Sequence, residues 1–225
     1  MELKNTVPWG RSFEEYKEIF SLTENDLLKY ILGCGDGPAS FNADLTSKGG
    51  KVVSIDPTYR FNVDQFKSRI EAVYNEIMPQ MEIYKDKYIW ESIFSVEELG
   101  KIRISAMEKF MVDYEKGKNE GRYKEASLPN LDFQDGQFDL ALCSHYLFLY
   151  SEQVDLEEHI NSLIELCRVA KEVRVYPLIT LNGEISPHLN KVILELKRIG
   201  KTTYLSDVNY KFQKGATQML VVKSV

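Results

Sequence analysis

Cysteine and histidine are scarce in this 225-residue chain, which contains three of each. Cys34, Cys143 and Cys167 stand far apart. They have neither the short spacing typical of a metal site nor the density of a disulfide framework. We therefore expect reduced thiols, no metal centre and a cytoplasmic location.

Long apolar runs and blocks of positive charge are also missing. No stretch approaches the roughly 18 apolar residues that span a bilayer, and the first residues lack the apolar core of a secretory signal. The net charge is −6, whereas sequence-independent binding to nucleic acid needs many contacts from Lys or Arg. We expect neither a membrane protein nor a nucleic-acid-binding protein. With 44% hydrophobic residues, the chain can still form a core.

What the sequence does contain is an alternation of apolar strands and amphipathic helices. Strands are expected at 30–35, 51–57, 121–127, 138–144 and 172–179, and helices at 38–48, 64–77, 95–117, 156–171 and 186–201. Two further strands, 202–212 and 217–225, flank "QKGA", which indicates a hairpin. This alternation predicts an α/β fold with a mostly parallel sheet, mixed at the edge where the last two strands run antiparallel.

We expect one domain over residues 1–225, with two helical additions. The first is an N-terminal segment at about 7–28, and the second is a helical insertion at about 62–118. The aromatic residues of the first addition fit either a helix that covers the sheet edge or a lid over a site, and the Pro-Trp-Gly-Arg turn before them favours the lid. These aromatic residues are Trp9, Phe13, Tyr16 and Phe20.

The stretch "ILGCGDG" places glycines at 33, 35 and 37, directly after the first expected strand. In parallel sheets, ligands bind at the carboxyl ends of the strands, where glycines let the backbone approach closely. Asp56 ends the second expected strand, where an acid can accept hydrogen bonds from ribose hydroxyls. The alternative to a ligand site is a tight strand-to-helix turn that binds no ligand. The spacing differs from the G-x-G-x-x-G of dinucleotide sites, whose last place falls on Pro38.

Three segments resemble the class I (Rossmann-like) S-adenosylmethionine-dependent methyltransferases: "ILGCGDG", "VVSIDP" and "LDFQDGQFDLALCSH". The likeness covers about residues 29–225, because "LCRVAKEVRVYPLI" is similar to the family's next helix and strand. It implies a Rossmann-like, mostly parallel seven-stranded sheet with helices on both faces and a C-terminal antiparallel hairpin. It also implies S-adenosyl-L-methionine as the cofactor.

The resemblance assigns roles residue by residue. The glycine turn would line the methionine and ribose side of the cofactor, and Asp56 would hold the ribose. Ile31 stands where the family commonly has an acid, so we expect Asp36 and Arg11 to hold the amino-acid end. The complete set of expected cofactor-binding residues is Gly33, Cys34, Gly35, Asp36, Gly37, Asp56, Pro57, Ser127, Leu128, Ser144 and Arg11.

His145 is the expected general base, because it follows the fourth strand at the end where this fold places its chemistry. Tyr146 or Tyr150 would orient the reacting group. The alternative for His145 is a structural histidine satisfied by loop hydrogen bonds. Asp139, at the start of the same strand, is expected to be structural.

The function that the resemblance implies is methyl transfer. We expect a small-molecule acceptor, because "CSHY" stands where methyltransferases of nucleic-acid amino groups carry an acid-Pro-Pro-Tyr motif. Three alternatives stay open: a non-catalytic S-adenosylmethionine-binding, regulatory or scaffold protein of the same fold, an NAD-dependent oxidoreductase, and a site that no longer binds a ligand. The sequence also leaves the oligomeric state open.

Overall fold

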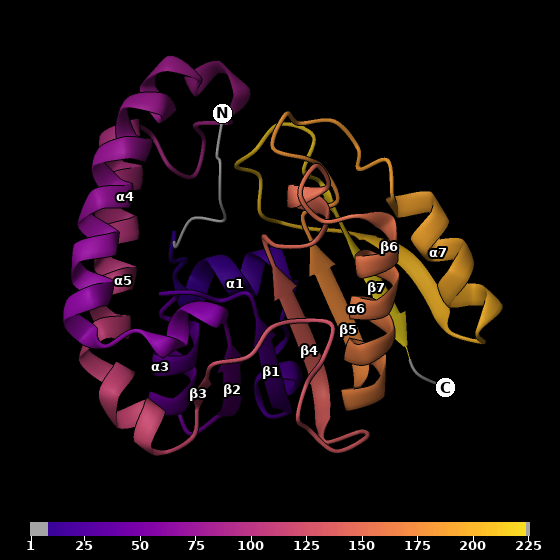
Figure 1. Ribbon diagram of the computed structural model, residues 1–225. Helices are drawn as coiled ribbons and strands as arrows, with labels where there is room; N and C mark the ends of the chain where they lie inside the picture. The colour runs from indigo at the N-terminus through magenta and orange to yellow at the C-terminus, as the bar shows by residue number, and fades with distance from the viewer. Residues whose placement is uncertain (1–8, 224–225) are drawn as a thin grey trace.

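A seven-stranded sheet forms the centre of the protein, in a computed structural model that describes residues 9–223. The strands lie in the order β3-β2-β1-β4-β5-β7-β6 (Figure 1). Neighbours among β1 to β5 run parallel, whereas β7 is antiparallel to both β5 and β6. This confirms the predicted fold class, a Rossmann-like mixed sheet. The strands are β1 (Tyr30–Cys34), β2 (Lys51–Ile55), β3 (Tyr123–Lys124), β4 (Phe138–Ser144), β5 (Ala170–Tyr176), β6 (Thr202–Asp207) and β7 (Gln218–Lys223).

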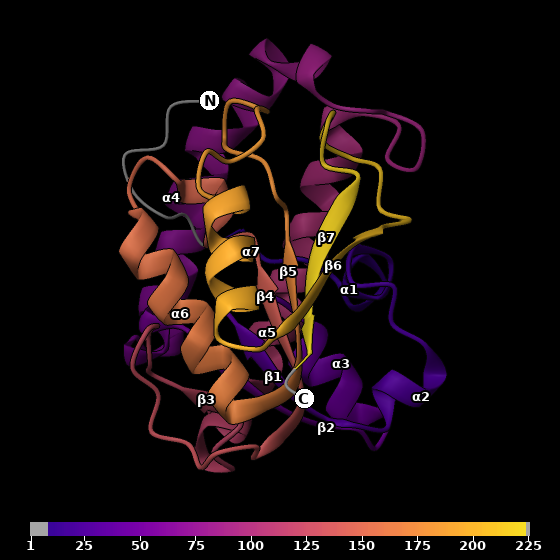
Figure 2. The same cartoon turned by 90° about the vertical axis from the view of Figure 1, so that its right-hand side faces the viewer.

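Helices cover both faces of the sheet. Figure 2 shows α6 and α7 on one face and α1, α2 and α3 on the other. The helices are α1 (Phe13–Ile19), α2 (Glu24–Leu27), α3 (Phe41–Ser47), α4 (Val63–Ile83), α5 (Val96–Asn119), α6 (Leu156–Val169) and α7 (Leu189–Arg198). Three short 3-10 helices are η1 (Pro57–Arg60), η2 (Lys85–Lys87) and η3 (Phe148–Tyr150). Among the residues from 9 to 223, no helix is long and apolar enough to cross a membrane.

The central strands are buried on both faces, as parallel strands usually are. In β1, Ile31 packs into the core under α1 and α3, whereas Leu32 packs into the core under α6 and α7. In β4, Leu140 and Ala141 divide in the same way. Successive side chains of a strand point to opposite faces, so each face of the sheet presents apolar residues against which a layer of helices packs.

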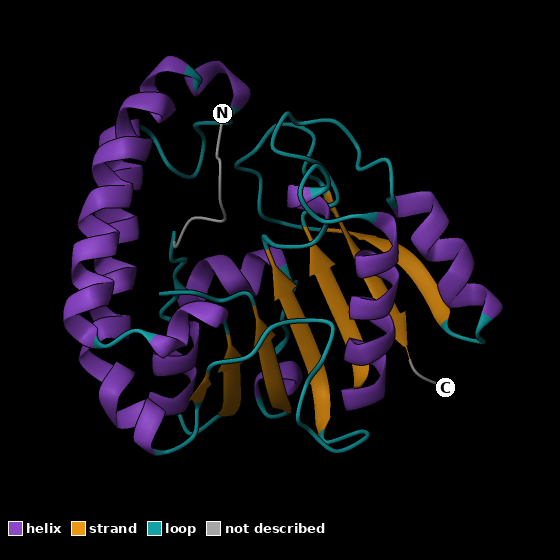
Figure 3. Ribbon diagram, in the orientation of Figure 1, coloured by secondary structure: helices purple, strands orange, loops and turns teal. Residues whose placement is uncertain are grey.

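The helices α4 and α5 pack against each other as a long hairpin beside the sheet (Figure 3). The prediction that the first of these helices ends at residue 77 was wrong, because α4 continues through Pro79 to Ile83. Its apolar stripe explains the extension: Ile77 and Met81 are both buried against the rest of the protein. An aromatic cluster joins the hairpin to the sheet edge and consists of Tyr59, Phe66, Phe110, Tyr114 and Tyr123.

The two terminal strands are joined by ten residues, 208–217, and the expected tight turn forms only part of this connection. The Ala216 N–H donates to the Gln213 carbonyl within it. The connection meets residues 85–90 at the end of the helical hairpin: the Ile89 N–H donates to the Phe212 carbonyl (2.7 Å), and the Lys214 N–H donates to the Lys87 carbonyl (3.1 Å). We call segments 85–90 and 208–217 together the clasp.

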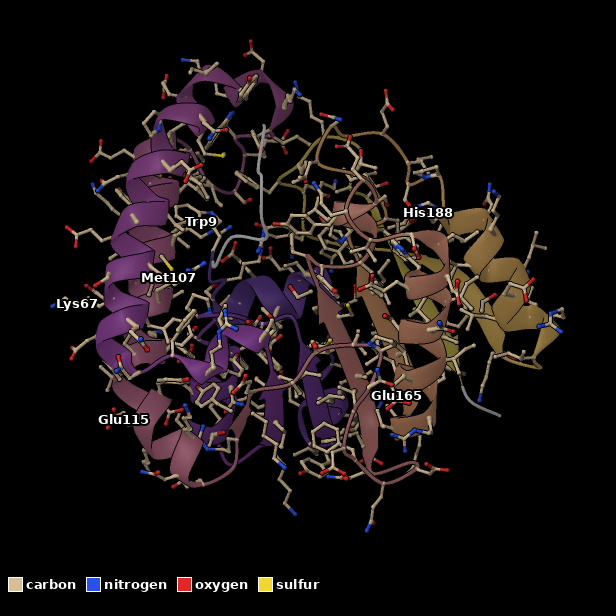
Figure 4. All side chains as sticks on the ribbon, viewed as in Figure 1. Trp9, Lys67, Met107, Glu115, Glu165 and His188 are labelled. Carbon is tan, nitrogen blue, oxygen red and sulfur yellow. The ribbon has the colours of Figure 1, made fainter. Side chains whose placement is uncertain are left out.

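The expected N-terminal lid corresponds to α1 and α2, and residues 7 and 8 of that expectation lie outside the described residues. Ser12 and Glu15 form a reciprocal capping box that starts α1. The ring of Tyr16 stacks on Phe41 of α3 with centroids 4.6 Å apart. Trp9 lies on the sheet side of the helical hairpin (Figure 4). This segment therefore packs as a docking helix, and it also brings side chains to the carboxyl ends of the strands.

Candidate functional site

A cavity of about 380 Å³ lies at the carboxyl ends of β1, β2 and β4, and we call it the first cavity. Of the residues expected to bind the cofactor, all except Gly33 line it. The expected residues that it brings together are Arg11, Cys34, Gly35, Asp36, Gly37, Asp56, Pro57, Ser127, Leu128, Ser144, His145, Tyr146 and Tyr150. The fold thus collects residues from distant parts of the sequence at one edge of the sheet, where α/β proteins bind ligands.

Asp56 connects the glycine turn to the second strand. One carboxylate oxygen accepts a hydrogen bond from the Gly37 N–H (3.0 Å), and the other accepts from the Thr58 N–H (2.8 Å). Burial raises the pKa of Asp56, and the hydrogen bonds from Thr58 and Gly37 oppose that rise. The Thr58 hydroxyl also donates to the oxygen that accepts from the Thr58 N–H. The carboxylate is therefore held in place at the cavity wall, and the oxygen that accepts from Gly37 keeps a lone pair that can accept a hydrogen bond from a ligand hydroxyl.

Asp36 explains why Gly33 is absent from the cavity wall. A Cβ at Gly33 would overlap the Asp36 carboxylate, which turns back beneath the end of β1. This carboxylate accepts hydrogen bonds from the hydroxyls of Tyr16 (2.7 Å) and Ser54 (2.6 Å). Burial raises the pKa of Asp36 to about 7, although these two hydrogen bonds oppose the rise. Ile31, at the position where the resemblance would place an acid, lies in the core.

The turn itself needs glycine for conformational reasons. Gly35 and Gly37 have φ angles of +72° and +49°, in the region that other residues rarely adopt. A Cβ on Gly35 would also lie 3.1 Å from the Tyr146 Cβ. The result is a backbone cradle to whose wall Gly35 and Gly37 add no side chain, open to the first cavity.

Arg11 carries a charge that the described residues leave uncompensated. Its Nη1 donates to the Trp9 carbonyl (3.3 Å), and its Nε is buried without a partner among residues 9–223. No ion pair joins Arg11 to a carboxylate in that part of the chain. Burial, and then the charge of Arg103, lower its pKa. Arg11 as a whole is partly exposed, but its Nε is buried without a partner, so an anionic group of a ligand beside the guanidinium would stabilise this arrangement.

His145 follows β4 in a left-handed conformation, with φ at +51°. Its N–H donates to the Tyr176 carbonyl (2.7 Å), and its Nδ1 lies 3.0 Å from the Ser144 hydroxyl. Burial, followed by the charges of Arg11 and Arg103, holds its pKa well below the ordinary value. The imidazole is therefore neutral at neutral pH and has a nitrogen that can accept a proton.

Tyr146 and Asp139 lie in different settings. The Tyr146 hydroxyl donates to Glu158 of α6 (3.3 Å), so that helix fixes its direction. Asp139 accepts from the Tyr30 N–H (3.1 Å) and pairs with Lys171 (2.7 Å), away from the first cavity, as expected for a structural residue. Cys34 and Cys143 are buried on neighbouring strands, and Cys34 also lines the first cavity.

A second cavity of about 100 Å³ adjoins the first. The two share Trp9, Arg11, His145 and Tyr150 as lining residues. The clasp covers the second cavity, where Tyr88 stacks on Phe212 with ring centroids 4.9 Å apart. Trp90 packs edge-on against the same Phe212 ring, at 5.5 Å.

A buried ion pair borders the second cavity. Arg103 of α5 is 1% exposed and donates to both carboxylate oxygens of Glu15 in α1, one at 2.6 Å. The Tyr210 hydroxyl donates to the same carboxylate (2.8 Å). Burial alone would raise the pKa of Glu15, but Arg103 lowers it to about 2. The Nε of Arg103 has no partner among the described residues.

Sequence reasoning did not find several residues of these cavities. Thr58, Gln153, Val154 and Glu158 line the first cavity, and Tyr88, Arg103, Tyr210 and Phe212 line the second. Thr58 carried a usable signal, since it follows the strand-end acid within "DPT". The four residues of the second cavity named here carried no such sequence signal, because they come from segments far apart in the sequence and follow no motif.

No protein-family model matches the chain. The chain is 31% identical over 225 residues to the uncharacterized protein MJ0045 of Methanocaldococcus jannaschii, covering 99% of this chain and 98% of that protein. The chain belongs to the same family as this archaeal protein.

Solved structures with a similar fold include S-adenosylmethionine-dependent methyltransferases. WbdD, described as a bifunctional kinase-methyltransferase, aligns with a TM-score of 0.51 and 14% identity. The alignment covers 94% of this chain and 40% of WbdD, so the chain spans about two fifths of that protein. A methyltransferase from Aquifex aeolicus aligns with a TM-score of 0.42 and 16% identity, over 93% of this chain and 87% of that one. At this level of identity the likeness to WbdD concerns the fold.

Proposed function

We propose that this protein is an S-adenosylmethionine-dependent methyltransferase acting on a small-molecule acceptor. One observation carries the proposal: the glycine cradle and the carboxylate of Asp56 face the same cavity at the carboxyl ends of β1 and β2. Neither feature alone distinguishes a ligand site from a tight turn. Together with Arg11 they supply what a nucleoside with an amino-acid tail requires: a close backbone, an acceptor for ribose hydroxyls and a cation for the carboxylate.

The residues present fit this cofactor. Gly35 and Gly37 line the cavity with backbone alone, so a ligand can approach the main chain there closely. The Asp56 oxygen that accepts from Gly37 can also accept from one ribose hydroxyl, and the other oxygen can accept from the second when that hydroxyl replaces the Thr58 hydroxyl. Arg11 has an unpaired guanidinium for the carboxylate of the methionine tail. Asp36 lines the same cavity, and an ammonium group beside it would favour the ionised form of this carboxyl. Pro57, Ser127 and Leu128 form the wall assigned to the adenine.

The cofactor, when bound, supplies a methyl group already activated on a sulfonium, whose carbon–sulfur bond breaks as the acceptor's lone pair forms the new bond. The protein then has to align the acceptor, exclude water and receive any proton that the acceptor releases. His145 borders both cavities, and its neutral imidazole can take that proton. Its left-handed backbone is a strained conformation of the kind found at functional sites.

The α1 segment and the clasp support a small acceptor. They border or cover the cavities next to His145, and the clasp is held by backbone hydrogen bonds between residues 85–90 and 208–217. A folded protein or a duplex could not reach His145 without opening these contacts. We therefore assign to α1 the role of a lid that also packs as a docking helix.

Calorimetric titration with S-adenosylmethionine, S-adenosylhomocysteine and NAD tests the proposal. We expect the first two to bind in the micromolar range and NAD not to bind. Binding of NAD alone would favour an oxidoreductase, and absence of binding by all three would refute the cofactor assignment. Cofactor binding without transfer of a radiolabelled methyl group to any compound in a metabolite extract would support the non-catalytic alternative.

A further inference from the structure

Seven of the fourteen described residues that line the second cavity carry flat aromatic rings. Tyr88 and Phe212 form one wall, and Tyr176 and Tyr210 contribute to the rest. Apolar cavities of roughly 150 Å³ hold one benzene molecule. The second cavity, at about 100 Å³, is smaller than this, so a ring fits there only because the cavity adjoins the first one and shares four lining residues with it.

The charges around this cavity do not balance. Arg11 and Arg103 are the charged side chains among its described lining residues, and Glu15 neutralises one of them through the ion pair with Arg103. One positive charge is left over. Each guanidinium also has a buried Nε without a partner among residues 9–223. Both charges act on His145, which faces the same space.

The proposed cofactor does not remove this excess. Its carboxylate and sulfonium have opposite charges and cancel, and its ammonium group is assigned to Asp36. The region between the two cavities would still carry one uncompensated positive charge. A cationic acceptor would add to this charge, whereas a monoanion would neutralise it.

We propose that the second cavity binds the methyl acceptor, and that the acceptor is a small planar aromatic molecule with one anionic group, a carboxylate or phenolate, held near Arg11 and Arg103. This inference rests on the proposed function. The aromatic walls select the planar ring, and the guanidinium groups select the anion through charge-assisted hydrogen bonds. The atom to be methylated would lie at the boundary with the first cavity, beside His145.

The test uses matched probes that differ in charge and share one ring. Benzoate, benzamide and benzylammonium are titrated calorimetrically into the protein with and without saturating S-adenosylmethionine, because the thioether of S-adenosylhomocysteine lacks the sulfonium that offsets the cofactor's carboxylate. We expect benzoate to bind at least roughly tenfold more tightly than benzamide, because it keeps the same shape and adds the charge. We expect no detectable binding of benzylammonium.

Two variants separate charge from shape. Arg11→Gln should bring the affinities for benzoate and benzamide close together. Phe212→Ala should weaken both by a similar factor, because it removes part of the aromatic wall and no charge. Circular dichroism and melting of each variant establish that it is folded. An unchanged preference for benzoate in Arg11→Gln would overturn the role of the guanidinium.

The outcomes also distinguish this inference from the proposed function. If S-adenosylhomocysteine binds while benzoate does not, or while benzamide or benzylammonium binds as tightly as benzoate, the acceptor class is wrong and the methyltransferase proposal stands. If benzoate binds while S-adenosylhomocysteine does not, the cavity recognises aromatic anions but the proposed function fails.

Discussion

Replacing Asp36 by Asn should remove a pH-dependent cost of folding. The carboxylate is 6% exposed and accepts hydrogen bonds from Tyr16 and Ser54. Asn has the same shape, keeps an oxygen for the Tyr16 hydroxyl and can donate from its nitrogen to the Ser54 oxygen. It cannot ionise, so a comparison of the variant with the natural protein isolates the titration of this one group.

The size of the effect follows from the displaced pKa. Burial raises the pKa of Asp36 from 3.8 to about 7, and each tenfold change in an acid dissociation constant corresponds to about 1.36 kcal/mol. The charged form is therefore disfavoured in the folded state by about 4 kcal/mol. Between these two pKa values the folded protein keeps a proton that the unfolded chain has released. The free energy of unfolding consequently falls as the pH rises through this window and levels off above about pH 7.

Urea unfolding of both proteins at pH 5, 6, 7 and 8 measures this slope. We expect the stability of Asp36→Asn relative to the natural protein to increase by about 1.4 kcal/mol per pH unit from pH 5 to 7, and then to stay constant. Asp132→Asn, at an exposed aspartate, is the matched control. A difference between Asp36→Asn and the natural protein that does not vary with pH would refute the reasoning that burial holds this carboxyl protonated.

Two substitutions and one titration also test the site. Asp56→Ala should weaken S-adenosylhomocysteine binding by about 100-fold or more, because two charge-assisted hydrogen bonds of about 1.5–3 kcal/mol each are lost; an unchanged calorimetric affinity would contradict the ribose assignment. Gly35→Val should lower the melting temperature and abolish binding, because φ is +72° and the new Cβ meets Tyr146; a variant that melts and binds like the natural protein would count against the cradle. The His145 imidazole should stay neutral from pH 6 to 8 in NMR spectra, and a midpoint near 6.5 would show that it is less buried than the structure indicates.

Local patterns were enough to predict the sheet and much of the first cavity. The strand at 138–144 was predicted with the bounds that β4 has, because a short apolar run between polar turns allows few alternatives. The glycine turn and Asp56 were informative for a similar reason. Each lies at the end of a strand, and the parallel arrangement of β1 and β2 brings such ends together without further information.

Two predictions made from local patterns, the role of Gly33 and the end of α4, were wrong. Gly33 belongs to the same motif as Gly35, yet it makes room for the Asp36 carboxylate beneath the strand. Spacing alone could not distinguish a glycine that faces a ligand from one that faces a buried side chain. The same limit applied to α4, which was expected to end at residue 77, whereas the buried stripe continues past Pro79 to Met81.

The second cavity depends on contacts that no local pattern encodes. Glu15 is separated by 88 residues from Arg103 and by 195 from Tyr210, yet the three form one hydrogen-bonded group. The sequence around each of these residues indicates only a helix or a loop. Their placement follows from the packing of α1, α5 and the 208–217 connection over the edge of the sheet. If the acceptor binds there, its specificity is set by this tertiary packing, whereas cofactor binding is set mainly by the strand-end motifs. Relatives could then keep "GCGDG" and the strand-end acid and still differ in acceptor through residues of α5 and the clasp.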